Sequence, residues 1–209
     1  MIGQTVSHYR IESEIGQGGM GVVYKAFDTR LERPVALKFL SPQFVSHPEA
    51  KSRFLNEARA ASALNHPNIC TIYEIGEWGS REFIAMELVE GKPLSKLIAS
   101  GKLPVPKVLD YSLQMAEGLD AAHKKGVIHR DVKPDNILVT AEGRLKIMDF
   151  GLAKIRHTAK ITTTGTALGT AAYMSPEQAR GELVDARADI FSLGMILYEM
   201  LTGRHPFAG

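Results

Sequence analysis

Acidic and amide residues that could handle a phosphate group and a metal ion gather in one part of the sequence. Residues 129–136 read HRDVKPDN, and Asp149 follows in KIMDFG. Between them, ILVT and RLKIM flank the turn AEG, which predicts a hairpin that brings Asn136 close to Asp149. Two oxygen ligands beside a phosphate chain are the usual way to hold Mg²⁺. Asp131 is not needed as a metal ligand in this arrangement, so it could accept a proton from an incoming hydroxyl group.

A glycine-rich stretch near the N-terminus could bring the backbone close to phosphates. Gly16, Gly18 and Gly21 have the spacing G-x-G-x-x-G, and glycine permits this approach because it has no Cβ. Both dinucleotide-binding folds and ATP-dependent phosphotransferases use this spacing. A dinucleotide fold enters a helix directly after the third glycine, but here VVYKAFD follows, whose β-branched and aromatic residues favour a strand. The glycines are therefore predicted to form a hairpin lid between two strands.

The next strand and the first helix supply a lysine and a glutamate. In PVALKFL, Ala36 and Lys38 share one strand face, and a small residue beside a lysine suits a flat base with phosphates next to it. Glu57 falls on the apolar stripe of the helix expected over 48–65, and an inward carboxylate needs a partner, for which Lys38 is the candidate. Two alternatives stay open here. Lys38 could be an ordinary edge-strand lysine, and Glu57 could pair with Arg53 at the edge of the stripe.

Composition and patterning indicate two halves in one chain. The 209 residues, 44% of them hydrophobic, suffice for one large domain or two small lobes. A net charge of +2 gives no case for nucleic acid as a partner, and the single cysteine, Cys70, excludes an intrachain disulfide, which fits a reducing compartment. No run approaches the roughly 18 apolar residues of a membrane span. A β-rich half to about residue 89 precedes a long amphipathic helix expected over 107–126, and the cleft between the halves is the expected ligand site.

These motifs, in this order, make the sequence resemble a eukaryotic-like Ser/Thr protein kinase of the type common in bacteria. The resemblance runs from about Tyr9 to Gly209 and rests on the glycine lid, VALK, HRDVKPDN and DFG. It implies an α+β, two-lobed protein-kinase-like fold. An antiparallel β-sheet N-lobe with one main helix would span 1–89, and a mostly helical C-lobe lacking its last helices would span 90–209. The implied function is transfer of the ATP γ-phosphoryl group to Ser or Thr hydroxyls of proteins, with ATP and Mg²⁺, or Mn²⁺ in its place, as cofactors.

The resemblance also implies roles for single residues. Asp131 would be the catalytic base, and Lys133, in DVKPDN, would touch the γ-phosphate in the Ser/Thr-kinase manner. Lys38 would hold the α- and β-phosphates and pair with Glu57, and Met86 would gate the pocket behind the base. The residues that would bind the metal are Asn136 and Asp149, and those that would contact the nucleotide are Gly16, Gly18, Gly21, Val23, Ala36, Lys38, Glu87, Val89 and Leu138.

The segment between DFG and SPE is the expected switch. It reads LAKIRHTAKITTTGTALGTAAYM, and its threonines need no special explanation in an ordinary loop. In family members with an arginine before the catalytic aspartate, here Arg130, a phosphothreonine of this loop pairs with that arginine and orders the segment. Thr162 and Thr164 best match the modified positions, with Thr163 and Thr166 close behind. The resemblance therefore implies activation by autophosphorylation of the loop.

The end of the sequence departs from the family pattern. SPE replaces the commoner APE, and the family domain continues with more helices after a stretch like IFSLGMILYEMLTGRHPFAG, where this sequence stops. Those helices normally supply an arginine to the glutamate matching Glu177 and cover the apolar helix over 190–201. The sequence is therefore interpreted as a C-terminally truncated kinase domain. The alternative function is an inactive fragment that retains at most nucleotide or partner binding.

Partners and location follow from the same resemblance. ATP and protein substrates are the expected partners, and a dimer of two kinase domains is a further one. Neither nucleic acid nor a membrane segment is expected for this chain. The expected location is the cytoplasm, with a membrane tether through a C-terminal part outside this sequence as the alternative.

Overall fold

Two compact units make up the structure. The computed structural model describes residues 1–18, 21–40, 48–79, 81–150 and 172–207, and the side chains of residues 48–51, 53 and 54 lie outside this description. The first unit comprises Met1–Ala63 and Thr71–Val89, and the second comprises Leu64–Cys70 and Glu90–Gly209. The chain therefore passes between the units three times.

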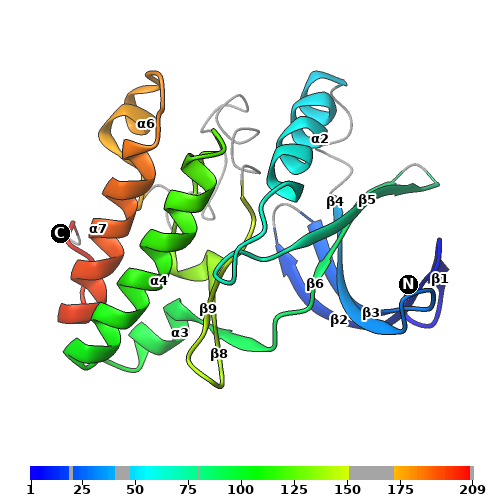
Figure 1. The fold of residues 1–209 in the computed structure, drawn as a ribbon, viewed down its shortest axis with the longest axis horizontal. Coiled ribbons are helices and arrows are strands. Elements are labelled where there is room, and N and C mark those ends of the chain that lie inside the picture. The colour runs from blue at the N-terminus through cyan, green and yellow to red at the C-terminus, as the bar shows by residue number, and fades with distance from the viewer. Residues whose placement is uncertain (19–20, 41–47, 80, 151–171, 208–209) are drawn as a thin grey trace. The chain divides into compact units, whose positions relative to one another are not determined.

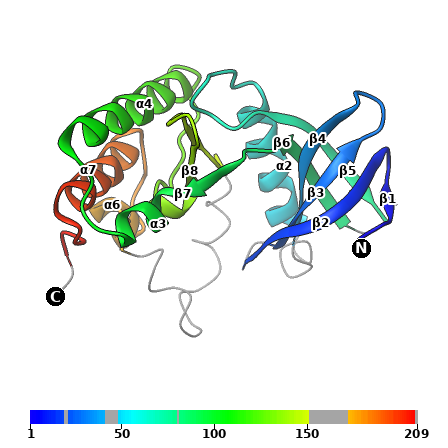
Figure 2. The ribbon, with the colours of Figure 1, turned by 90° about the horizontal axis from the view of Figure 1, so that it is seen from below.

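A six-stranded antiparallel sheet with one helix forms the first unit. The strands follow the order β1–β2–β3–β4–β6–β5. The helix α2 contacts β5, and Figures 1 and 2 show it beside the sheet. The bounds are Thr5–Val6 for β1, Tyr9–Gly18 for β2, Gly21–Asp28 for β3, Arg33–Leu40 for β4, Pro48–Ser62 for α2, Ile72–Trp78 for β5 and Arg81–Glu87 for β6.

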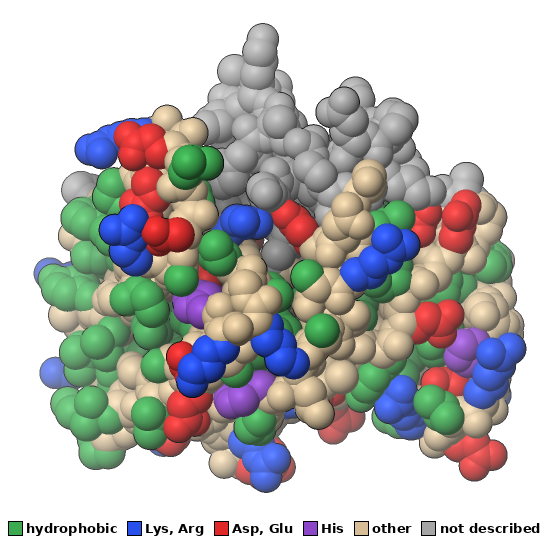
Figure 3. Space-filling model, turned by 45° about the horizontal axis from the view of Figure 1, so that its top comes forward, with side chains coloured by type: hydrophobic (Ala, Val, Ile, Leu, Met, Phe, Trp, Pro, Cys, Tyr) green, Lys and Arg blue, Asp and Glu red, His purple; other side chains and the backbone are tan. Residues whose placement is uncertain are grey.

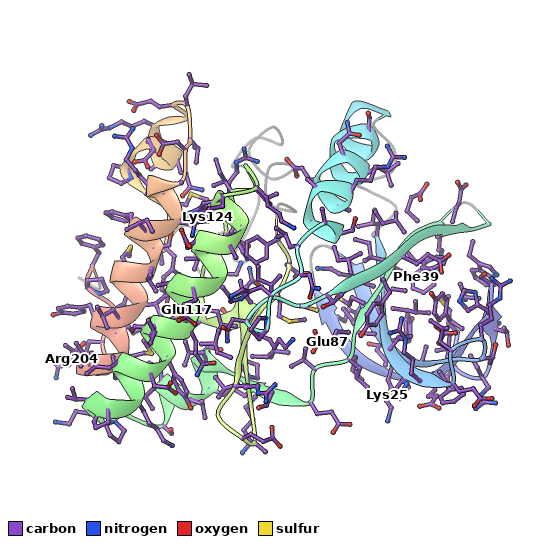
Figure 4. All side chains as sticks on the ribbon, in the orientation of Figure 1. Lys25, Phe39, Glu87, Glu117, Lys124 and Arg204 are labelled. Atoms are coloured by element: carbon purple, nitrogen blue, oxygen red, sulfur yellow. The ribbon has the colours of Figure 1, made fainter. Side chains whose placement is uncertain are left out.

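Aromatic side chains and a central strand build the core of this unit. Every residue of β4 from Val35 to Leu40 is buried, as expected for a strand covered on both faces. The ring of Phe39, labelled in Figure 4, lies 5.8 Å from that of Phe83, measured between centroids. A Cβ atom on Gly76 would lie only 2.4 Å from the Phe83 ring, so the packing of this ring requires glycine on β5.

Helices dominate the second unit. The helices α4 and α7 pack together, and Figures 1 and 2 show them side by side. The strands β7, β8 and β9 form a small antiparallel sheet. The bounds are Gly91–Pro93 for β7, Leu94–Ala99 for α3, Val105–His123 for α4, Pro134–Asn136 for the 3₁₀ turn η1, Ile137–Thr140 for β8, Leu145–Ile147 for β9, Pro176–Arg180 for α6 and Arg187–Thr202 for α7.

Large apolar side chains lie at the surface of the two long helices. Leu109 and Leu113 of α4 are exposed, as are Ile190 and Tyr198 of α7. Figure 3 shows hydrophobic side chains spread over the left of the view, where these helices lie. The expected apolar helix over 190–201 therefore has an exposed face in addition to its buried one. Within the ranges that the structure describes, no helix combines the length and the apolarity that a membrane crossing needs.

Two details differ from the sequence expectations. The helix expected over 107–126 runs from Val105 to His123. The segment Leu64–Cys70 packs with the second unit, although the division at residue 89 places it in the first half. The second difference arises from long-range packing, which local sequence patterns do not encode. Glu177, whose expected arginine partner lies outside this sequence, is half-exposed in the first turn of α6.

Candidate active site

The segment HRDVKPDN brings three of the sequence-predicted residues into direct contact. Lys133 Nζ donates a hydrogen bond to Asp131 Oδ2 at 2.8 Å. Asn136 Nδ2 donates to the Asp131 backbone oxygen at 2.8 Å and to Asp131 Oδ2 at 3.1 Å. Asp131 and Lys133 are both buried. A buried carboxylate is stable in its charged form only when it is paired, and this cluster supplies the pairing.

The hydrogen bonds between described side chains and the Asp131 carboxylate reach only one of its two oxygens. Both Lys133 and Asn136 bond to Oδ2. Among the described residues, none donates a hydrogen bond to Asp131 Oδ1. The arrangement can therefore hold one oxygen in place while the other accepts a proton from a neighbouring hydroxyl.

His129 connects this segment to the residue before Asp149. Its Nδ1 accepts a hydrogen bond from the Asp131 backbone N–H at 3.2 Å, and its Nε2 lies 2.8 Å from the Met148 carbonyl oxygen. The ring therefore bridges the catalytic segment and the residue before Asp149. The ring is fully buried and packs on Phe150, with 4.7 Å between centroids. Sequence reasoning quoted this histidine within its motif but gave it no role.

Asp189, in the first turn of α7, binds the backbone of the same segment. Its carboxylate accepts hydrogen bonds from the backbone N–H groups of His129 and Arg130, both at 2.8 Å, and lies 2.7 Å from His123 Nε2. Burial alone would raise the pKa of this carboxyl. The hydrogen bond from His123, the nearby His129 and the two backbone bonds outweigh burial and hold its pKa below the ordinary value.

The Asp189 contacts predict a stability effect that depends on pH. Asp189→Ala should lower the free energy of unfolding at neutral pH by about 3–5 kcal/mol, because it strands buried donors. A carboxyl with a lowered folded pKa stabilises above its unfolded value, about 3.9, and loses this as pH falls through the folded pKa. Denaturant titrations at several pH values should show the variant and the parent converging below about pH 4. The exposed Asp120, changed to Asn, is the control and should stay within about 0.5 kcal/mol of the parent. A gap that does not narrow as the pH falls would contradict this reasoning.

Arg130 holds a strained backbone conformation that α6 supports. Its φ of 66° lies in the left-handed region, which is unfavourable for a residue with a side chain. The Arg130 carbonyl oxygen accepts a hydrogen bond from Gln178 Nε2 at 2.7 Å. Gln178 is itself fixed by a capping box with Ser175 at the N-terminus of α6. The SPE segment thus stabilises the turn that presents Asp131.

The expected hairpin is present, and it places Asn136 beside the end of β9. Strands β8 and β9 pair antiparallel, with Ile137 opposite Ile147. The Met148 backbone N–H donates to the Asn136 carbonyl oxygen at 2.8 Å, so Asn136 adjoins the residue before Asp149. Asp149 has a φ of 59°, a second left-handed residue at the site. Leu138 lies on β8 and is half-buried.

The glycine motif of the first unit forms the expected hairpin. Strands β2 and β3 pair antiparallel up to the Gly18–Gly21 pair. At Gly18 a Cβ atom would meet no atom within 4 Å, and at Gly16 it would reach only Val23 Cβ, 4.0 Å away. Neither position has a positive φ, so neither the backbone nor the packing of the protein itself requires glycine there. The open space above these two glycines suits a ligand that approaches the backbone closely.

The lysine of VALK shares one sheet face with two apolar candidates. Val23 on β3 is the register partner of Lys38 on β4, and Ala36 lies two residues before Lys38. Register partners and residues two apart point to the same face of a sheet, so these three side chains lie together. Lys38 is only 6% exposed, unlike an ordinary edge-strand lysine. Its pairing with Glu57, a half-buried residue of α2, stays a prediction.

The end of β6, which is expected to contact the nucleotide base, is held by hydrogen bonds to Thr71. The backbone N–H of Glu87, labelled in Figure 4 at the end of β6, donates to the Thr71 carbonyl oxygen at 2.9 Å. Glu87 Oε2 accepts the Thr71 backbone N–H at 3.2 Å. Val89 follows, half-buried, as the last residue of the first unit. The predicted phosphorylation positions Thr162 and Thr164 lie outside the described residues.

Sequence reasoning missed the residues that hold the catalytic segment in place. Asp189 and Gln178 contact it from α7 and α6, which lie more than 40 residues further along the chain, and His123 of the preceding helix contacts Asp189. A carboxylate at the start of the otherwise apolar α7 was the one available signal, because a buried charge needs a stated partner. Gln178 gave no signal, since its role depends on where α6 packs.

Comparisons with known proteins give close matches over nearly the whole chain. A "Probable serine/threonine-protein kinase" of Clostridium acetobutylicum is 49% identical over 99% of this chain and 32% of its own length. The serine/threonine-protein kinases PknL and PknA of Mycobacterium tuberculosis are each 44% identical. They match 97% and 100% of this chain and 51% and 50% of their own lengths. The chain thus spans about half or less of the length of these curated relatives.

Solved structures and a family model agree with these relatives. The crystal structure of the Mycobacterium tuberculosis PknI kinase domain superposes with a TM-score of 0.81 at 31% identity, covering 99% of this chain and 79% of that one. It confirms the two-lobed kinase fold, with a sheet-based unit and a helical unit, that the sequence predicts. The family model described as "Protein kinase domain" matches residues 9–209, so the chain belongs to the protein kinase family.

Proposed function

We propose that this protein transfers the γ-phosphoryl group of ATP to Ser or Thr hydroxyls of proteins. The observation that carries the proposal is the buried cluster of Asp131, Lys133 and Asn136, which leaves Asp131 Oδ1 open among the described residues. Phosphoryl transfer needs a positioned nucleophile and compensation of charge more than it needs covalent chemistry. A fixed carboxylate with a lysine next to it offers both.

The first unit supplies the candidate nucleotide contacts. The open space at Gly16 and Gly18 fits phosphates close to the backbone, and Gly21 closes the hairpin. Lys38 would bind the α- and β-phosphates, with Val23 and Ala36 beside it on the same face. Glu87 and Val89 would offer backbone groups to the base, and Leu138 of the second unit would cover it.

A divalent metal ion belongs to this chemistry, and Asn136 and Asp149 are the residues that would hold it. One amide oxygen and one carboxylate, completed by phosphate oxygens, form the donor set that Mg²⁺ prefers, and Mn²⁺ accepts the same ligands. When bound, the ion would offset the negative charge of the phosphates. Asn136 fits the role because its Nδ2 points to Asp131, which orients the amide.

Different residues of the chain would have different roles in positioning and activating the substrate hydroxyl. Asp131 Oδ1 would orient the hydroxyl and accept its proton. Lys133, which is bonded to Asp131 Oδ2, would contact the transferred phosphoryl group as charge develops on it. Glu57 would orient Lys38. His129 and Asp189 would keep the Asp131 backbone in place.

Regulation and partners extend the proposal. A phosphate on Thr162 or Thr164 would pair with Arg130, whose backbone is already fixed between Asp189 and Gln178. Protein substrates would be phosphorylated in the cytoplasm, and the buried Cys70, which forms no disulfide, agrees with a reducing compartment. A dimer of two kinase domains stays a prediction.

Transfer of label from γ-labelled ATP tests the proposed function. The purified chain is incubated with labelled ATP, Mg²⁺ and a general protein acceptor, and the labelled amino acid is identified after hydrolysis. We expect phosphoserine or phosphothreonine, and no label when a chelator removes the metal. A folded protein that binds Mg-ATP but labels neither itself nor the acceptor would overturn the proposal.

A further inference from the structure

The strand β9 is short, and its outer edge is satisfied by groups from outside the sheet. Strand β8 pairs with one edge of β9, so Leu145 and Ile147 direct their backbone groups to the other. The Ile147 N–H donates to the Asn68 carbonyl oxygen at 2.8 Å, and the Ile147 carbonyl oxygen accepts the Cys70 N–H at 2.9 Å. The segment Leu64–Cys70 therefore acts as a partner strand for this one residue.

At Leu145, side chains make the edge hydrogen bonds that a partner strand would otherwise make. The Leu145 N–H donates to Gln114 Oε1 at 2.8 Å, and the Leu145 carbonyl oxygen accepts Asn68 Nδ2 at 3.0 Å. Leu145 is fully buried, so these backbone groups have no access to bulk water. The two amide side chains thus extend the edge pairing of β9 by one step toward the turn.

The Gln114 amide uses all of its hydrogen-bonding capacity. Besides Leu145, its Oε1 accepts Asn68 Nδ2 at 2.9 Å. Its Nε2 donates to Asp110 Oδ2 at 3.1 Å and to the Gly143 carbonyl oxygen at 3.2 Å. An amide has two acceptor and two donor positions, and all four are occupied. Because Gly143 lies in the β8–β9 turn, Gln114 joins α4 to both the turn and the strand.

The hydrogen bonds of the Gln114 side chain to Leu145 and Gly143 are called the clamp below. They affect the two residues that flank the hairpin. Strands of three and four residues cannot hold a register by themselves, and a slip of one residue would turn every side chain to the other face. Asn136 immediately precedes β8, and Asp149 is the second residue after the end of β9. The Met148 N–H bond to the Asn136 carbonyl oxygen ties these two ends together.

We propose that Gln114 is a positioning residue for the metal-binding pair, because its side-chain amide fixes the register of the hairpin that carries Asn136 and Asp149. The inference rests on the proposed function. Gln114 lies on α4 and bonds to neither Asn136 nor Asp149, so it acts only through the hairpin. Residues that orient metal ligands in this indirect way typically change metal affinity or activity by about 10- to 100-fold when they are replaced.

Two variants separate the hydrogen bonds of Gln114 from its volume. Gln114→Met keeps the length and removes every polar atom. Asp110→Asn with Gln114→Glu exchanges the amide and the carboxylate, so that the acceptor for Leu145 N–H and the α4 contact are kept, while the donor to the Gly143 carbonyl oxygen is lost. Glu117→Met, on the exposed face of the same helix (Figure 4), is the matched control.

The first measurement needs no activity. Amide hydrogen exchange of Leu145 in the nucleotide-free protein should speed up at least about 10-fold in Gln114→Met, and the exchanged pair should restore most of the protection. Unchanged protection of the Leu145 amide in Gln114→Met would refute the clamp, irrespective of ATP binding or phosphoryl transfer. Melting curves show whether each variant is folded. If Gln114→Met does not fold, a freely exchanging Leu145 N–H in the exchanged pair overturns the clamp instead.

The second measurement reads the metal site. The Mg²⁺ concentration for half-maximal stabilisation by ATP, and for half-maximal transfer, should rise about 10-fold or more in Gln114→Met, and KM for the protein acceptor should change little. The exchanged pair should recover most of the Mg²⁺ response, and Glu117→Met should match the parent. An equal loss at all Mg²⁺ concentrations would mean a general structural role and would refute the positioning role. Absence of transfer in the parent would count against the proposed function alone, because the Mg²⁺ dependence of ATP binding remains measurable.

Discussion

Asparagine in place of Asp131 is expected to lower phosphoryl transfer by about 100- to 10,000-fold, the usual contribution of a general acid or base. Asparagine keeps the shape of the side chain, and its oxygen can still accept the bonds from Lys133 and Asn136. Its amide has no basic oxygen for the proton of the attacking hydroxyl. ATP binding should stay close to the parent, since Asp131 is not a proposed nucleotide ligand. Initial rates with labelled ATP and thermal shifts with Mg-ATP measure the two effects separately.

The control for Asp131→Asn is Asp120→Asn, an exposed change of the same kind on α4. It should leave both the rate and the thermal shift unchanged. Near-normal turnover of Asp131→Asn would show that another group accepts the proton. An equal loss of ATP binding would show instead that Asp131 belongs to the nucleotide site.

Methionine in place of Lys38 is expected to weaken ATP binding by roughly 10- to 150-fold, the value of one hydrogen bond to a charged group. Methionine retains the apolar stem of this buried side chain and removes the ammonium that should contact the phosphates. A ligand that binds only the folded state raises its stability by RT ln(1 + [L]/Kd), so the loss should appear as a smaller rise of Tm. Thermal melts over a series of Mg-ATP concentrations give the Kd directly.

The matched control is Lys25→Met, on the neighbouring strand β3 and labelled in Figure 4. Lys25 forms an ion pair with Glu12 at 3.8 Å, and both side chains are more than a third exposed, so this pair adds little stability. Lys25→Met should therefore bind ATP like the parent. Equal binding by Lys38→Met and the parent would remove Lys38 from the nucleotide site and would also remove the reason for a Glu57 partner.

Local patterns predicted the parts of the structure that depend on neighbouring residues. The strand after Gly21 and the β8–β9 hairpin follow from β-branched runs and turn residues, and the structure confirms both. The contact of Asn136 with the end of β9 follows from the hairpin itself. Family membership rests on motif order, which a sequence displays in full.

Other parts depend on contacts that no local pattern contains. The bonds of Asp189 to His129 and Arg130 join residues about 60 positions apart, and only the oddity of a charge in an apolar helix pointed to them. The assignment of Leu64–Cys70 to the second unit depends on backbone bonds from Asn68 and Cys70 to Ile147. Backbone groups are the same in every residue, so such bonds leave no trace in side-chain patterns.

The membership of Leu64–Cys70 in the second unit limits how this protein can be divided or recombined. A cut at residue 89 looks natural along the chain, but it would separate Asn68 and Cys70 from the strand edge that they complete. A chimera that joins the first unit of this protein to the second unit of a relative should therefore take residues 64–70 from the relative. This seven-residue segment and β9 would then come from the same protein, so the hydrogen bonds between them would be kept. The boundary of the exchange would be set by hydrogen bonding and not by position along the chain.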